Sequence, residues 1–246
     1  NFSWLGKDED LTRLNEYLQR DEKHAMQLNV LGFNSRHKFW AWGNGILDLT
    51  DKAEFIPADD FGMVETKSGN TFFIPSANQL NGLTDDVNEI SPESKFVYTD
   101  TKLTFNEWSR MHRIAYQENS AIGQLWYVAS IFRDVIFGHP SIKRFPSLFL
   151  YGPPGVGKGS FTNSVLSLNG FPRSSISLES NTSTPKGILR SFAQFKNGIV
   201  WLDEYKNSIP KNLIALLKQI YDGSSYARAK KSNDARTEST PIHASA

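Results

Sequence analysis

The chain has 246 residues, of which 39% are hydrophobic and 13% aromatic, as expected for a globular protein with one large domain or two modest ones. It contains no cysteine, which excludes disulfides, thiolate zinc sites and cysteine nucleophiles and is compatible with a cytoplasmic location. Residues 1–100 carry 17 acidic and 9 basic side chains, whereas residues 101–246 carry 9 acidic and 18 basic ones. The basic half indicates either a polyanionic partner or a solvated basic surface.

The sequence of residues 1–100 predicts one exposed helix followed by short strands, which together form a small β-rich accessory domain. The helix is expected over residues 11–26, where apolar side chains recur at helical spacing among many charges. Short β-prone runs follow, separated by turn sequences such as Gly43-Asn44-Gly45. They lie at residues 28–33, 38–42, 71–74 and 96–98. This spacing favours a mostly antiparallel unit, and no catalytic constellation is evident in it.

Residues 101–140 predict a helical lead-in. Thr104 and Glu107 form a capping-box pattern that opens a helix through about Gln117. A second helix is expected over residues 121–137, ended by Gly138-His139-Pro140. This apolar stretch does not predict a membrane span, because Gln124, Arg133 and Asp134 interrupt it. The N-terminus has no basic segment followed by an apolar core, so no signal peptide is expected.

Residues 141–246 alternate between predicted strands and helices. Strands are expected over residues 148–151, 175–178 and 199–202. Helices are expected over residues 158–168, from Thr184-Pro185 onward, and over 210–221, the last one ended by Asp222-Gly223. This alternation predicts an α/β domain with a parallel sheet and ligand sites at the carboxyl ends of its strands.

A glycine-rich loop follows the first of these strands and matches the pattern G-x-x-x-x-G-K of phosphate-binding loops. Such loops aim backbone N–H groups at phosphate oxygens, while the lysine reaches the β and γ phosphates. The predicted ATP-binding residues are Gly152, Pro153, Pro154, Gly155, Val156, Gly157, Lys158, Gly159 and Ser160. Gly159 stands where a magnesium-binding hydroxyl is usual. Either water, phosphate and Asp203 hold the Mg²⁺, or the hydroxyl of Ser160 partly substitutes for the one that Gly159 lacks.

Asp203 and Glu204 end an apolar run 45 residues after Lys158. If the two strands are neighbours, both acids lie beside the loop. Asp203 would hold the water shell of the metal, and Glu204 would polarise the attacking water as a general base. An acidic pair after an apolar run is common at solvated strand ends, so this interpretation depends on the loop.

A basic segment lies further along the chain. Between Lys206 and Lys231 there are six basic residues and one acidic residue. The alternation over residues 226–231 suits a hairpin arm that presents Arg228, Lys230 and Lys231, although a basic loop without a special role has the same composition.

These three motifs together resemble motifs A, B and B′ of superfamily 3 helicases, which are AAA+-related ATPases. The resemblance covers about residues 121–246 and is nearest to primase–helicases of phages, plasmids and poxviruses. It implies a P-loop ATPase core of AAA+ type over residues 141–246, preceded by the lead-in and the β-rich domain. It also implies ATP and Mg²⁺ as cofactors, single-stranded or fork DNA as partner, assembly into a hexameric ring, and contacts with other replication proteins. Lys158 and Glu204 would then be catalytic, and Arg228, Lys230 and Lys231 would touch the DNA backbone.

Residues 240–246 resemble the start of the strand that carries motif C in this family. We therefore expect a piece of a longer protein that binds ATP better than it hydrolyses it. Three alternatives remain. One is an AAA+ loader or remodelling ATPase that acts on protein. A second is a nucleoside monophosphate kinase, suggested by the loop and by Asn-Gly-Phe-Pro-Arg at residues 169–173, although this string lies too near the loop for such a kinase. A third treats the acidic N-terminal unit as an interaction module that recruits other replication proteins.

Overall fold

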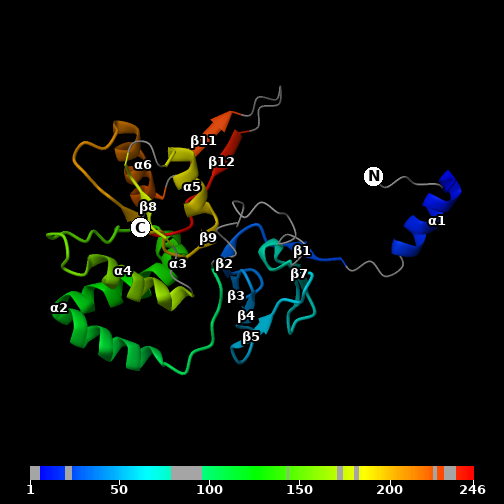
Figure 1. Ribbon diagram of the computed structural model, residues 1–246, viewed down its shortest axis with the longest axis horizontal. Helices are drawn as coiled ribbons and strands as arrows, with labels where there is room; N and C mark the ends of the chain where they lie inside the picture. Colours follow the sequence, from blue (N-terminus) through cyan, green and yellow to red (C-terminus); the bar gives the residue numbers. More distant parts are fainter. Residues whose placement is uncertain are drawn as a thin grey trace.

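The computed structural model describes residues 6–19, 24–78, 96–142, 144–170, 174–179, 183–223, 226–229 and 237–246 (Figure 1). Its first helix, α1 (Asp8–Gln19), lies apart from the remaining elements in Figure 1. The helix begins three residues earlier than expected, because Asp8, Glu9 and Asp10 place negative charge at the positive end of the helix dipole. Residues 20–23, within the range expected for this helix, lie outside the described residues.

The β-rich region that follows is mostly antiparallel, as predicted. One sheet has the strand order β5-β4-β3-β2-β9, in which β2 to β5 pair antiparallel, and a second has the order β1-β7-β6. The strands are β1 (Met26–Gln27), β2 (Leu31–Asn34), β3 (Phe39–Trp42), β4 (Gly45–Asp48), β5 (Glu54–Pro57), β6 (Met63–Glu65) and β7 (Thr71–Phe73), followed by a 3₁₀ turn at Pro75–Ala77. Their buried side chains include Phe39, Ile46 and Phe72.

The fifth strand of the larger sheet comes from the other end of the chain. Strand β9 (Phe195–Lys196) pairs parallel with β2. Gly32 permits this close approach, since a Cβ there would lie 2.1 Å from the carbonyl oxygen of Lys196. The buried ring of Phe195 packs against Phe96 at a centroid distance of 4.7 Å. The core of the β-rich region therefore includes residues well beyond position 100.

The helical lead-in is a hairpin of two helical arms. Helix α2 (Phe105–Ile131) begins with the predicted capping box of Thr104 and Glu107 and is interrupted at Gln117, where φ is 51° and ψ is −126°. Residues Phe105 and Tyr127 would be about 33 Å apart along a straight helix. Their rings are 6.5 Å apart, so the chain turns back at Gln117. Helix α3 (Arg133–Gly138) follows. The two predicted helices are thus confirmed, with boundaries shifted by a few residues.

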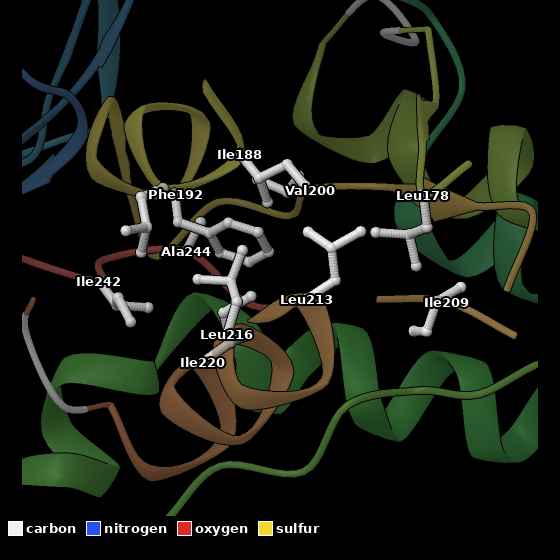
Figure 2. Close-up of a cluster of buried hydrophobic side chains, with 11 residues drawn as sticks. Leu178, Ile188, Phe192, Val200, Ile209, Leu213, Leu216, Ile220, Ile242 and Ala244 are labelled. Atoms are coloured by element: carbon white, nitrogen blue, oxygen red, sulfur yellow. The ribbon is translucent and has the colours of Figure 1, made fainter. Parts of the chain in front are cut away.

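Three further helices lie in the described residues of the C-terminal part, the last two around an apolar core and the first against α2. They are α4 (Lys158–Leu166), which continues into a 3₁₀ turn at Ser167–Asn169, α5 (Pro185–Ala193) and α6 (Lys211–Asp222). Figure 2 shows side chains of α5 and α6 pointing toward one another in this core, among them Ile188, Phe192, Leu213, Leu216 and Ile220. The Thr184 cap of α5 and the Gly223 stop of α6 are both formed as the sequence predicts.

The predicted AAA+-type core with a central parallel sheet is wrong for the part of the chain that the structure describes. Where both partners belong to the described residues of 141–246, parallel pairing is limited to two residues each in β8 (Ile176–Ser177) and β10 (Leu202–Asp203), and to an isolated bridge between Ile199 and Ser245. Residues 148–151 form no strand, although the N–H of Leu148 donates to the carbonyl of Ala246 at 2.9 Å.

The exposure of residues 148–151 gives the physical reason. A central parallel strand is buried on both faces. Here Leu148 and Leu150 pack inward, whereas Phe149 remains 63% exposed and Tyr151 remains 92% exposed. Residues 148–151 thus form an apolar run, as the sequence indicated, but the rest of the protein packs against only one of its two faces.

Among the described residues, no helix is both long enough and apolar enough to cross a membrane.

Candidate functional site

The glycine-rich loop leads directly into α4, with Gly157 at the N-cap position. Gly157 has φ 87° and ψ 15°, and Gly155 has φ 81°. These left-handed conformations favour glycine. A Cβ at either position would meet no atom within 4 Å. Glycine is therefore favoured at positions 155 and 157 by the backbone conformation and not by a lack of space for a side chain.

The first turn of α4 offers unpaired backbone donors. No side chain caps the helix, because its N-cap residue is a glycine. The N–H of Phe161 donates to the carbonyl of Gly157 at 2.9 Å, but the three preceding N–H groups have no carbonyl four residues back within the helix. Together with the helix dipole they form a site that attracts anions. The residues present therefore fit a phosphate group.

Lys158 folds back over the loop that precedes it. Its ammonium group donates to the carbonyls of Gly152 and Pro153, both at 2.8 Å. An ammonium group has three donors, so this arrangement leaves one N–H for a further acceptor. The loop thus holds a positive charge beside the uncapped helix end, without a carboxylate partner among the described residues.

Helix α4 is fixed to the α2 hairpin, which positions the loop. The ring of Phe161 packs against His112 and Tyr116, each at a centroid distance of 5.0 Å. A Cβ at Gly123 would lie 2.4 Å from the Phe161 ring, so this glycine allows the second arm of α2 to approach α4. The indole of Trp108 also donates to Ser164 at 3.2 Å.

The two predicted acids lie at the end of β10. Leu178, which follows β8, donates its N–H to the carbonyl of Asp203 at 2.9 Å. The Asp203 carboxylate accepts the N–H of Glu204 at 2.8 Å, and Glu204 has a left-handed φ of 58°. The chain therefore turns sharply where β10 ends, and both carboxylates stand at the carboxyl end of the two short parallel strands.

A lysine accompanies these acids. The ammonium group of Lys206 hydrogen-bonds to Glu179, and it lies 3.9 Å from the carboxylate of Glu204. The pKa of Lys206 is raised, first by the hydrogen bond to Glu179 and then by the negative charges of Glu179 and Glu204. Sequence analysis did not identify this lysine as part of the site, because its partner Glu179 is 27 residues away in the sequence.

Two contacts bring the acid-bearing segment beside the loop and its flank. A Cβ at Gly159 would lie 3.8 Å from the indole of Trp201, just before β10. The ring of Tyr205, just after the acids, meets the edge of Phe149 at a centroid distance of 5.5 Å. Sequence analysis did not identify Trp201 and Tyr205 as part of the site, because apolar and aromatic residues in such a run are typical of a buried strand.

The described residues contain no group of three or more histidine, aspartate or glutamate side chains that could hold a metal ion alone. Mg²⁺ in nucleotide sites usually keeps several waters and takes one or two carboxylates together with phosphate oxygens. Asp203 therefore fits a magnesium ion that arrives with a nucleotide. Ser160 lies exposed in the first turn of α4.

The predicted basic arm falls partly outside the described residues. Strand β11 (Tyr226–Ala229) pairs antiparallel with β12 (Thr237–Thr240), and Arg228 stands opposite Glu238 in this register. Lys230 and Lys231 lie outside the described residues.

Comparison of the chain with protein-family models, characterised proteins and solved structures finds no match.

Proposed function

We propose that this chain binds and hydrolyses ATP, as the motor domain of a replicative DNA helicase or primase–helicase of a phage or other mobile element. It would act in the cytoplasm on single-stranded or fork DNA. The observation that carries the proposal is the adjacency of two segments far apart in the sequence: a Cβ on Gly159 would lie 3.8 Å from the indole of Trp201, and the ring of Tyr205 lies 5.5 Å from that of Phe149. The acids between Trp201 and Tyr205 therefore belong to the same region as the loop.

The proposed chemistry assigns a role to each polar group. The N–H groups of the first turn of α4 and the Lys158 ammonium bind the phosphates. Asp203 orients the water shell of the magnesium ion, and Glu204 accepts the proton of the attacking water. Bound magnesium supplies charge neutralisation for the triphosphate. Arg228, Lys230 and Lys231 contact the DNA backbone, and subunits assemble into a ring.

Equilibrium binding of Mg-ATP tests the nucleotide site. Lys158→Ala removes a charged hydrogen-bond donor and is expected to weaken Mg-ATP binding at least about tenfold, which is about 1.4 kcal/mol. The matched control is Lys102→Ala, which removes an exposed lysine outside the site. The proposal fails if wild type does not bind Mg-ATP at millimolar concentration, or if both variants bind it like wild type.

Product analysis separates the proposed function from the alternatives. Incubation with ATP and single-stranded DNA is expected to yield ADP and inorganic phosphate faster than incubation with ATP alone. Formation of ADP from ATP plus AMP, without phosphate release, would identify a nucleoside monophosphate kinase instead. Hydrolysis that DNA leaves unchanged would favour an ATPase that acts on protein.

A further inference from the structure

Lys206 connects the ends of the two short parallel strands. Its ammonium group hydrogen-bonds to the carboxylate of Glu179, two residues after β8, and lies 3.9 Å from the carboxylate of Glu204, directly after β10. Since β8 and β10 pair in parallel, both acids stand at the carboxyl edge of the strand pair, which is where α/β proteins bind their ligands. The lysine therefore bridges this edge from one strand to the other.

The backbone around Lys206 is fixed on both sides. On one side, the ring of Tyr205 meets the edge of Phe149 at a centroid distance of 5.5 Å. On the other side, the carbonyl of Lys206 accepts the N–H of Ile209 at 3.1 Å, and Ile209 is buried in the core that α5 and α6 share. The lysine thus extends from a segment that is anchored to the rest of the protein.

The carboxylate of Glu204 has few contacts of its own. Its backbone has a left-handed φ of 58°, which is disfavoured for a residue other than glycine, and its N–H donates to the Asp203 carboxylate at 2.8 Å. Among the described residues, Lys206 is the only ion-pair partner of the Glu204 carboxylate. Lys206 is therefore the group that restricts where this carboxylate points.

Stability does not account for this arrangement. The side chains of Lys206, Glu179 and Glu204 are 55%, 49% and 55% exposed. Ion pairs this exposed contribute little to the free energy of unfolding, because water and salt screen them. Orientation is a different matter, since a general base must lie within hydrogen-bond distance of the water from which it takes a proton.

We propose that Lys206, anchored by Glu179, is a positioning residue that orients the Glu204 carboxylate toward the attacking water. This inference rests on the proposed hydrolysis of ATP. In that reaction the water oxygen bonds to the γ-phosphorus, ADP leaves, and the proton of the water passes to Glu204. Lys206 acts on this step through Glu204 alone.

Steady-state hydrolysis of ATP by Lys206→Met tests the proposal, because methionine keeps an unbranched side chain and removes the charge. Phosphate release at saturating Mg-ATP is expected to fall at least about tenfold, since general base catalysis contributes about 10²- to 10⁴-fold. The KM for Mg-ATP and its equilibrium binding are expected to stay as in wild type, because Lys158 and Asp203 are unchanged. Lys206→Arg keeps the charge and is expected to retain most of the turnover.

The matched control is Lys218→Met, which removes an exposed lysine of α6 that forms no ion pair in the described structure. It is expected to hydrolyse ATP like wild type, and circular dichroism establishes that all variants are folded. Lys206 is not a positioning residue if Lys206→Met keeps or exceeds the wild-type turnover, if arginine is as damaging as methionine, or if the control loses as much.

A double variant tests the connection from Glu179 through Lys206. Glu179→Gln removes the charge that anchors the lysine and is expected to lower the turnover, but less than Lys206→Met does. If Glu179 acts only through Lys206, the variant with both changes hydrolyses ATP no more slowly than Lys206→Met alone. Losses that multiply in the double variant would overturn the anchoring role of Glu179.

The wild-type protein distinguishes failure of this inference from failure of the proposed function. Wild-type hydrolysis together with an unaltered Lys206→Met overturns the role of Lys206 alone. A wild-type protein that binds Mg-ATP but releases no phosphate overturns the proposed hydrolysis and the role of Lys206 together, and leaves the nucleotide site standing.

Discussion

At the scale of single residues, Gly159 is the position where the loop differs from the common phosphate-binding pattern. A Cβ there would lie 3.8 Å from Trp201, an ordinary van der Waals contact, so space does not exclude a larger residue. Gly159→Ser supplies the hydroxyl that usually ligates magnesium. We expect about tenfold tighter binding of ATP in the presence of Mg²⁺, measured by calorimetry, and unchanged binding when the metal is chelated.

The matched control for this change is Gly159→Ala. Alanine also stabilises α4 relative to glycine, by about 1 kcal/mol, but brings no hydroxyl. An equal gain in Mg-ATP affinity for alanine and serine would show that the benefit comes from the helix backbone. The interpretation of Gly159 as a missing metal ligand would then be abandoned.

At the scale of elements, the reversal of α2 depends on one strained residue. Gln117 has φ 51° and ψ −126°, a conformation that a Cβ disfavours and that costs about 1–3 kcal/mol for a residue other than glycine. Its side chain is exposed, so a substitution removes little packing. Gln117→Gly relieves the strain, partly offset by the greater flexibility of glycine in the unfolded chain. We expect a net gain of about 1 kcal/mol in the free energy of unfolding, measured with urea.

Gln117→Ala keeps the Cβ and is therefore expected to give no gain. If glycine and alanine shift the urea midpoint equally, strain at this turn does not contribute to stability. The two arms of the hairpin are joined by polar contacts, in which Ser109 donates to Gln124 at 2.7 Å and Gln124 donates to the carbonyl of Ser109 at 3.1 Å. Local strain at the turn is thus compensated by contacts between the two arms.

At the scale of the whole molecule, a buried histidine, His112, and a half-buried one, His243, couple stability to pH. Burial lowers the pKa of His112, and burial together with the charges of Lys196 and Arg133 lowers the pKa of His243. Each therefore stays neutral to a lower pH in the folded state than in the unfolded chain, whose histidines take up protons near pH 6.5. Stability is therefore fully present above about pH 6.5 and is lost as the pH falls below that value toward the folded pKa of each histidine.

Thermal unfolding between pH 7.5 and pH 5 tests this coupling. His112→Asn removes a titrating group and retains a polar atom near Ser120, which lies 2.6 Å from the His112 ring nitrogen. We expect a lower melting temperature at pH 7.5 but a smaller decrease toward pH 5 than in wild type. His24→Asn, at an exposed position, is the control and should follow the wild-type profile. A variant profile parallel to wild type would mean that His112 does not contribute to the pH dependence.

Features with local causes were predicted correctly from the sequence. The Thr104 capping box, the Thr184 cap of α5 and the glycine stop of α6 are each decided by side chains within four residues of a helix end. In contrast, the expected strand at residues 148–151 is not formed, because strand formation requires partners along its whole length, and these lie elsewhere in the chain.

The sequence by itself determined the caps of α2 and α5, that a glycine-rich loop at residues 152–157 precedes a helix, and that the β-rich region is mostly antiparallel, because each follows from residues close together in the chain. Only the tertiary structure decided that β9 completes the N-terminal sheet, that α2 folds back so that Phe105 meets Tyr127, and that Trp201 approaches Gly159 while Tyr205 packs against Phe149. These contacts join residues tens of positions apart. Their energies depend on burial and shape complementarity between distant surfaces, which local patterns of apolar and polar residues do not encode.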